Sequence, residues 1–164
     1  MAVSTDILHS FARPRAVLRS LRDGERREAR VLVYLMLACA LIFVAQWPRL
    51  ARQAHLDDSI PLDALLAGAL FGWVFVAPLL FYAAAMLLAL AMRLVAPVQP
   101  FDVRLALFWS LLVASPMVLL QGLVTGLIGP GVAALVTGIA VAGVFGAVLV
   151  AGLRVAVEAA RIPA

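Results

Sequence analysis

Four long apolar runs constrain the fold more than any other feature of the sequence, and they lie at residues 31–47, 62–92, 105–128 and 132–153. No Asp, Glu, His, Lys or Arg occurs from residue 64 to 92 or from 105 to 153. A helix needs about 20 apolar residues to cross a hydrocarbon core about 30 Å thick. Charged residues make up only 13% of the 164 residues, too few to cover a water-soluble domain. We therefore predict an all-α integral membrane protein with four transmembrane helices.

Prolines lie inside the second and third runs, and we expect both helices to be kinked. The second run is longer than one crossing requires, so its helix should tilt, kink at Pro78 or project beyond the bilayer. In the third run, Pro116 cannot donate a hydrogen bond to the carbonyl of Leu112. The first run is slightly short, and its helix is expected to begin upstream, near Glu28.

A Gly-Pro-Gly sequence at Gly129, Pro130 and Gly131 separates the last two runs and carries no charge. These residue types favour a tight turn, which predicts an antiparallel helical hairpin. The chain then divides into an arginine-rich cytoplasmic segment at 1–30, a membrane domain at 31–154 and a short cytoplasmic tail at 155–164.

The arginines are distributed unequally between the two sides of the predicted bundle. One side receives Arg13, Arg15, Arg19, Arg22, Arg26, Arg27, Arg30, Arg93, Arg104, Arg154 and Arg161. The other side receives only Arg49 and Arg52. Because basic residues near span ends favour the cytoplasmic side, we expect both termini in the cytoplasm. A five-span alternative would place the C-terminal arginines outside.

The segment before the first run has the pattern of a short amphipathic helix. Pro14 is suited to the first turn of a helix, in which Val17, Leu18 and Leu21 share one side. Arginines occupy the other side, as in helices that lie in the membrane plane. The alternative, weighted equally, is packing of this helix on the protein's own spans. The candidate contacts with anionic lipid headgroups or a partner are Arg13, Arg15, Arg19 and Arg22.

The groups that support catalysis or metal binding are scarce. His9 and His55 are separated by the first span, so they cannot share a metal in this topology. The hydroxyl groups in the spans have no histidine or lysine nearby to act as a base. The single cysteine, Cys39, lies in an apolar run and is interpreted as a packing residue. We therefore predict no enzymatic activity and no cofactor, and the basic charge lacks the motifs that would indicate nucleic-acid binding.

Small residues at helical spacing predict close packing between spans. Gly68 and Gly72 form one GxxxG motif and Gly122 and Gly126 form another. Packing within the chain is favoured over packing between chains, although an interaction with itself or another membrane protein stays open. The candidate packing residues are Gly68, Gly72, Pro116, Gln121, Gly122 and Gly126.

The predicted spans also contain polar groups, among them the amide of Gln121 and the indole rings of Trp47 and Trp109. The amide of Gln121 needs partners in lipid, which the carbonyl freed by Pro116, Ser115, Thr125 or a facing helix could supply. Trp47 and Trp109 lie near proposed span ends, where indole rings prefer the membrane interface.

The pattern P-R-x-x-x-R-x-L, formed by Pro14, Arg15, Arg19 and Leu21, precedes these compact glycine- and proline-rich spans. In this the sequence resembles small bacterial members of the Yip (Ypt-interacting protein) family. The resemblance implies a small multispanning membrane protein with a cytoplasmic N-terminus. Eukaryotic members are associated with Rab-type GTPases, but they usually have five spans and a D-L-Y-G-P-type signature, which this sequence lacks. The resemblance therefore implies the class of protein and no functional residue.

These observations, together with the resemblance to bacterial proteins, favour a non-enzymatic integral protein of a bacterial inner membrane that scaffolds, organises or assists another membrane component. It would act through helix packing and through its basic cytoplasmic segment, with anionic headgroups as one partner. The alternative is a small transporter or pore for a neutral or apolar solute, with Gln121 lining the route.

Overall fold

The computed structural model describes residues 3–24, 27–57 and 59–161, and this part of the chain is helical without strands. Its elements are α1 (Val3–Ala12), α2 (Pro14–Asp23), α3 (Glu28–Leu56), α4 (Leu62–Phe71), η1 (Gly72–Val76), α5 (Ala77–Arg93), α6 (Pro100–Leu127) and α7 (Val132–Ala160). Four helical units are long and apolar enough to cross a membrane: α3, the continuous α4–η1–α5 unit, α6 and α7. The predicted class and the four spans are confirmed. The five-span alternative finds no further apolar helix in the described residues.

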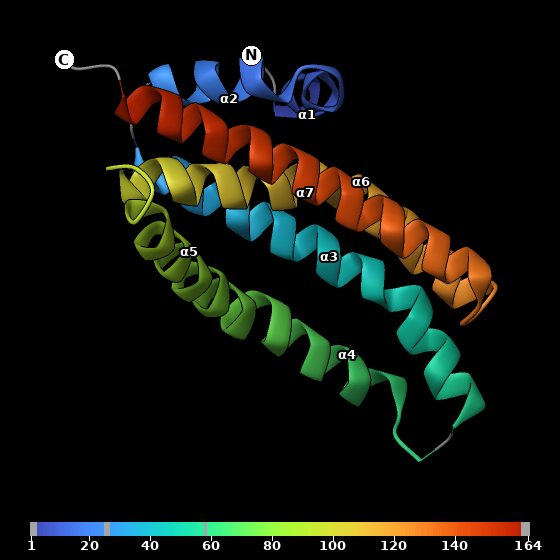
Figure 1. The fold of residues 1–164 in the computed structure, drawn as a ribbon. Helices are drawn as coiled ribbons and strands as arrows, with labels where there is room; N and C mark the ends of the chain where they lie inside the picture. The colour runs from blue at the N-terminus through green and yellow to red at the C-terminus, as the bar shows by residue number, and fades with distance from the viewer. Residues whose placement is uncertain (1–2, 25–26, 58, 162–164) are drawn as a thin grey trace.

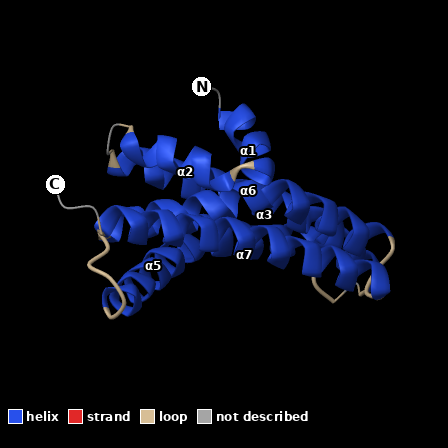
Figure 2. Ribbon diagram, turned by 45° about the horizontal axis from the view of Figure 1, so that its top comes forward, coloured by secondary structure: helices blue, strands red, loops and turns tan. Residues whose placement is uncertain are grey.

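Helix α6 is the centre of the bundle, where it packs between α3 and α7 (Figure 1). In its most apolar stretch 61% of the residues are buried, compared with 6% in α7 and 22% in the α4–η1–α5 unit. Within the α4–η1–α5 unit, α4 and η1 pack against α3, and α5 packs mainly against α6 (Figure 1). Helices α1 and α2 lie across one end of α6 and α7 (Figure 2). The N-terminal helices, the α5–α6 connection and the C-terminal end of α7 are therefore at one end of the bundle.

The first span is longer than its apolar run. Helix α3 begins at Glu28, as expected, and continues beyond Trp47 to Leu56. Pro48 lies inside this helix, and the turns after it are polar. The helix therefore extends past the predicted span at 31–47 on the side that carries Arg49 and Arg52.

The second span is interrupted near the predicted kink. A π-helical turn, η1, immediately precedes Pro78, and the α4–η1–α5 unit bends along its length (Figure 1). Because Pro78 has no N–H group for the carbonyl of Val74, the regular hydrogen-bond ladder cannot pass this position, and a wider turn accommodates the ring. By contrast, α6 continues through Pro116 without interruption. The hydroxyl of Ser115 donates a 2.8 Å hydrogen bond to the carbonyl of Leu112, which Pro116 leaves free.

The predicted turn between the last two spans is confirmed. Helix α6 ends at Leu127, α7 begins at Val132, and Gly129 adopts φ +93°, which favours glycine. The side chain of Arg52, from α3, caps the C-terminal end of α6. Its Nη1 donates to the carbonyl of Leu127 at 3.3 Å and to that of Gly126 at 3.4 Å. The guanidinium thus satisfies carbonyls that the end of a helix leaves free.

Candidate functional site

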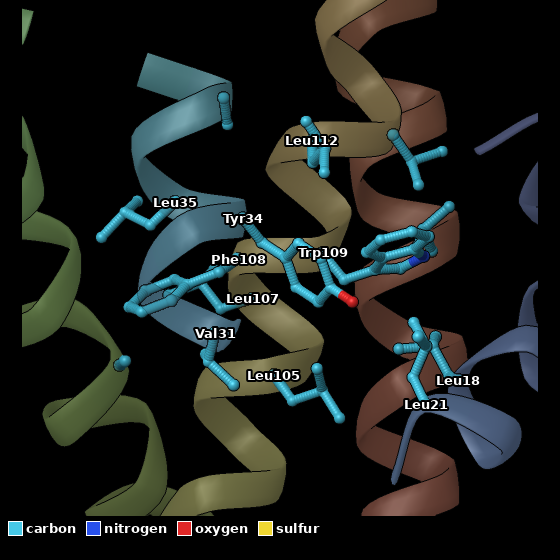
Figure 3. Packing of buried hydrophobic residues seen from close by; sticks show 14 of the residues in the cluster. Leu18, Leu21, Val31, Tyr34, Leu35, Leu105, Leu107, Phe108, Trp109 and Leu112 are labelled. Atoms are coloured by element: carbon cyan, nitrogen blue, oxygen red, sulfur yellow. The ribbon is translucent and has the colours of Figure 1, made fainter. Parts of the chain in front are cut away.

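The N-terminal helices are docked on the bundle by their apolar sides. Leu18 and Leu21 of α2 are buried in the main hydrophobic cluster, near α6 and α7 (Figure 3). Gly152 of α7 provides the space, since a Cβ there would lie 2.7 Å from the Cβ of Ala106 and 3.3 Å from Leu18 Cδ1. Of the two alternatives, packing on the protein's own spans is therefore the one found in the structure. The sequence pattern could not distinguish the two alternatives, because lipid and the protein's own spans would both cover the same apolar side of α2.

A buried tryptophan ties α1 to the third span. Trp109 is fully buried, and its Nε1 donates a 3.0 Å hydrogen bond to the hydroxyl of Ser10. Its ring packs edge-on against Tyr34 of α3 with 4.9 Å between centroids (Figure 3). Trp109 was expected near the membrane interface by its place in the sequence, and the structure shows that its side chain is enclosed within the bundle. The indole has instead the hydrogen-bond partner that a buried Trp N–H requires, from a helix nearly a hundred residues earlier in the chain.

Two of the predicted lipid-contact arginines form ion pairs within the chain. Arg22 of α2 places Nε 3.4 Å from Oδ2 of Asp102, a carboxylate whose side chain is only 5% exposed. Arg19 forms an ion pair of 2.5 Å with Glu158 of α7. Asp102 was missed as a site residue because it precedes the third apolar run. It lies in the first turn of α6, where the helix dipole favours a negative charge.

The Arg22–Asp102 pair predicts a loss of stability on substitution. We expect Arg22→Gln to lower the free energy of unfolding by about 2 kcal/mol, because the buried carboxylate would lose its charged partner. The substitution should also increase protease cleavage near α2. Both can be measured in detergent micelles, with Arg15→Gln, on the exposed side of the same helix, as the control. Equal losses in the two variants would contradict a specific role for the pair.

The other two predicted contact arginines, Arg13 and Arg15, line a groove of about 510 Å³ between the α1–α2 junction and α7. We call it the arginine groove, and its lining residues are Ala12, Arg13, Pro14, Arg15, Ala16, Arg19, Ala147, Val150, Ala151 and Arg154. Arg13, Arg15 and Arg154 make no ion pair with any described residue. Arg13 and Arg15 were predicted as contact residues, whereas Arg154 joins them only in the folded bundle. The groove can therefore offer guanidinium groups to an anion.

The two predicted glycine motifs have different surroundings. A Cβ added to Gly122 would lie 2.0 Å from the carbonyl oxygen of Ala45, and one added to Gly126 would lie 2.3 Å from the Cβ of Pro48. These glycines therefore allow α6 to approach the backbone of α3. Cβ atoms added to Gly68 and Gly72 would meet no atom within 4 Å. The expected packing within the chain is absent at this second pair in the described structure.

Gln121 lies between the third and fourth spans. Its amide nitrogen is close to Gly138 of α7, where an added Cβ would lie 3.0 Å away. Its backbone carbonyl accepts a 2.9 Å hydrogen bond from the hydroxyl of Thr125. The freed carbonyl of Leu112 is bonded to Ser115, so the structure does not use it as a partner for the Gln121 amide. An open pocket of about 190 Å³ beside Gln121 is lined by residues of α3 and α6, including Gln46 and Arg49.

The groups that would perform chemistry are not assembled in the described part of the chain. No set of three His, Cys, Asp or Glu side chains there is placed to hold a metal ion. Cys39 is buried inside α3. Comparisons with family models, curated proteins and solved structures gave no match to this chain. The resemblance to the Yip family thus stays a prediction from the residues, and the function is argued from the geometry.

Proposed function

We propose that this protein is a non-enzymatic scaffold or accessory factor of a bacterial inner membrane, with both termini in the cytoplasm. It acts by packing a second membrane helix against the α4–η1–α5 unit, while its basic cytoplasmic end contacts the membrane surface. The observation that carries the proposal is the open GxxxG face formed by Gly68 and Gly72.

This face has the form that allows two membrane helices to approach closely. Gly68 and Phe71 lie in α4 and Gly72 is the first residue of η1, and their i, i+3 and i+4 spacing places them on one side of the α4–η1–α5 unit. Phe71 and Phe75 are both exposed and stack with 5.6 Å between ring centroids. Lipid chains can cover any apolar helix, but glycines without a neighbour leave a hollow that another helix fills with more contacts. The α4–η1–α5 unit is thus a candidate surface for a partner or a second copy.

The alternative of a transporter or pore has less support. Its proposed route would pass Gln121 between the third span and its neighbours. There, α3 and α6 are in backbone contact at Gly122 and Gly126, and the Gln121 amide lies against α7. The pocket beside Gln121 has a volume of about 190 Å³, compared with about 510 Å³ for the arginine groove at the opposite end of the bundle.

Crosslinking in native membranes tests the scaffold proposal. We expect reproducible crosslinked partners or oligomers for the wild-type chain, and about a tenfold loss of them in Gly72→Leu, because the leucine side chain fills the space that allows a second helix to approach; a tenfold loss corresponds to about 1.4 kcal/mol. Ala142→Leu is the matched control, since Ala142 is a small exposed residue on α7. A wild-type protein that stays monomeric without partners, or equal crosslinking in both variants, would contradict the proposal.

A further inference from the structure

The arginine groove combines four guanidinium groups from two parts of the chain with no acidic residue in its lining. Glu158, next to the groove, is bonded to Arg19, and its carboxylate also interacts electrostatically with Arg15 and Arg154, so this one neighbouring negative charge faces four guanidinium groups. Arg13 and Arg15 approach from the α1–α2 junction and Arg154 from α7. Bringing like charges together at the edge of an apolar bundle costs free energy unless an anion lies between them. The groove therefore has a deficit of negative charge that a ligand would supply.

The start of α2 adds to this positive field. The helix begins at Pro14 beside the groove, and the side chain of Arg13 does not cap it with a hydrogen bond. Pro14 has no N–H group, and the N–H groups of Ala16 and Val17 are bonded to the carbonyl of Arg13, so α2 contributes mainly the positive end of its helix dipole. Phosphate groups commonly bind where such a terminus and arginine side chains meet.

The exposed surface of α7 indicates that the phosphate belongs to a lipid. Along this helix a stripe of exposed residues, spaced three or four apart, leads to Arg154. Its members are Val136, Ile139, Gly143, Ala147 and Val150. A Cβ at Gly143 would meet no atom within 4 Å, so the middle of the stripe is shallow and unobstructed. An acyl chain can lie on this stripe while its headgroup occupies the groove.

We propose that the arginine groove binds the phosphate of an anionic phospholipid whose acyl chain lies along α7. The bound lipid bridges the N-terminal helices to the last span, because Arg13 and Arg15 contact the same phosphate as Arg154. This inference deepens the proposed function, on which it rests for the placement of the bundle in a bilayer. It goes further by assigning a defined lipid site rather than a diffuse basic surface.

The test uses the full chain in phosphatidylcholine nanodiscs with phosphatidylglycerol as the minor lipid. Native mass spectrometry then counts the phosphatidylglycerol that each variant retains. We expect Arg154→Gln and Arg15→Gln each to weaken retention about fivefold, the effect of removing one basic group from an anionic lipid surface. Arg93→Gln is the control, since it removes an exposed arginine at the same end of the bundle but outside the groove. Equal retention in all three variants and the wild type would overturn the proposal.

Two further measurements separate the alternatives. Added inorganic phosphate should not displace phosphatidylglycerol at equal concentration, because it lacks the acyl chain; displacement would show that the site binds free phosphate instead. Phosphatidylglycerol should protect the N-terminal helices from protease in the wild type but not in Arg154→Gln. If crosslinking still depends on Gly72 but Arg154→Gln retains as much phosphatidylglycerol as the wild type, only the proposed lipid site is contradicted. If crosslinking is lost and specific retention persists, only the scaffold proposal fails.

Discussion

Replacing Gly122 with leucine is expected to lower the free energy of unfolding by about 3 kcal/mol, the upper part of the usual range for overpacking a core. The new Cβ would lie 2.0 Å from the carbonyl oxygen and 2.8 Å from the carbonyl carbon of Ala45. These are backbone atoms inside a continuous helix, so the strain can be relieved only by separating α3 from α6. Equilibrium unfolding in mixed micelles measures the change.

Gly68→Leu is the matched control for this experiment. It makes the same change of side chain at the first glycine of the other GxxxG motif, where an added Cβ meets no atom within 4 Å. In the monomeric protein its effect should be near zero or slightly stabilising, because leucine favours the helix more than glycine does. Equal destabilisation at Gly68 and Gly122 would contradict the contact described between α3 and α6.

Trp109→Ala should cost about 3–5 kcal/mol, as expected for removing a large aromatic side chain from a packed core. The variant loses the edge-on contact with Tyr34 and the hydrogen bond to Ser10. Because that hydrogen bond ties α1 to α6, protease cleavage near α1 should increase together with the loss of stability. Unfolding in micelles and limited proteolysis measure the two effects.

Trp47→Ala separates a structural role from a general effect of removing tryptophan. Trp47 is 49% exposed on α3, and its replacement should change the free energy of unfolding only slightly. Trp109→Phe retains much of the ring packing and removes the N–H donor, so it should release α1 with a smaller loss of stability. Equal destabilisation by Trp47→Ala and Trp109→Ala would contradict the role of Trp109 as a buried residue that stabilises the core.

The four spans could be predicted because the residues that require a helix lie within each span itself. Long charge-free runs require a helix in lipid wherever they occur, and Gly129 to Gly131 stop a helix by their own backbone preferences. Pro14 likewise marked the start of α2 without reference to any other part of the chain.

The partners of these helices could not be predicted in the same way. Periodicity identified Leu18 and Leu21 as one apolar side, but it contains no information on whether lipid or α7 covers that side. Two identical GxxxG motifs also proved different, because the approach of α3 to Gly122 depends on the arrangement of the whole bundle. Asp102 acquires its importance only through Arg22, eighty positions earlier.

The distances along the chain between these contacts have a consequence for biogenesis. Ribosomes synthesise α1 and α2 first, yet Ser10 binds Trp109, and Arg19 binds Glu158, 139 positions later. Helix α1 can therefore make its bond to Trp109 once the third span is present, whereas α2 cannot complete its contacts until the last span has left the ribosome and entered the bilayer. The docking of α2 onto the bundle is therefore a late step of folding, because its partners on α7 are synthesised last.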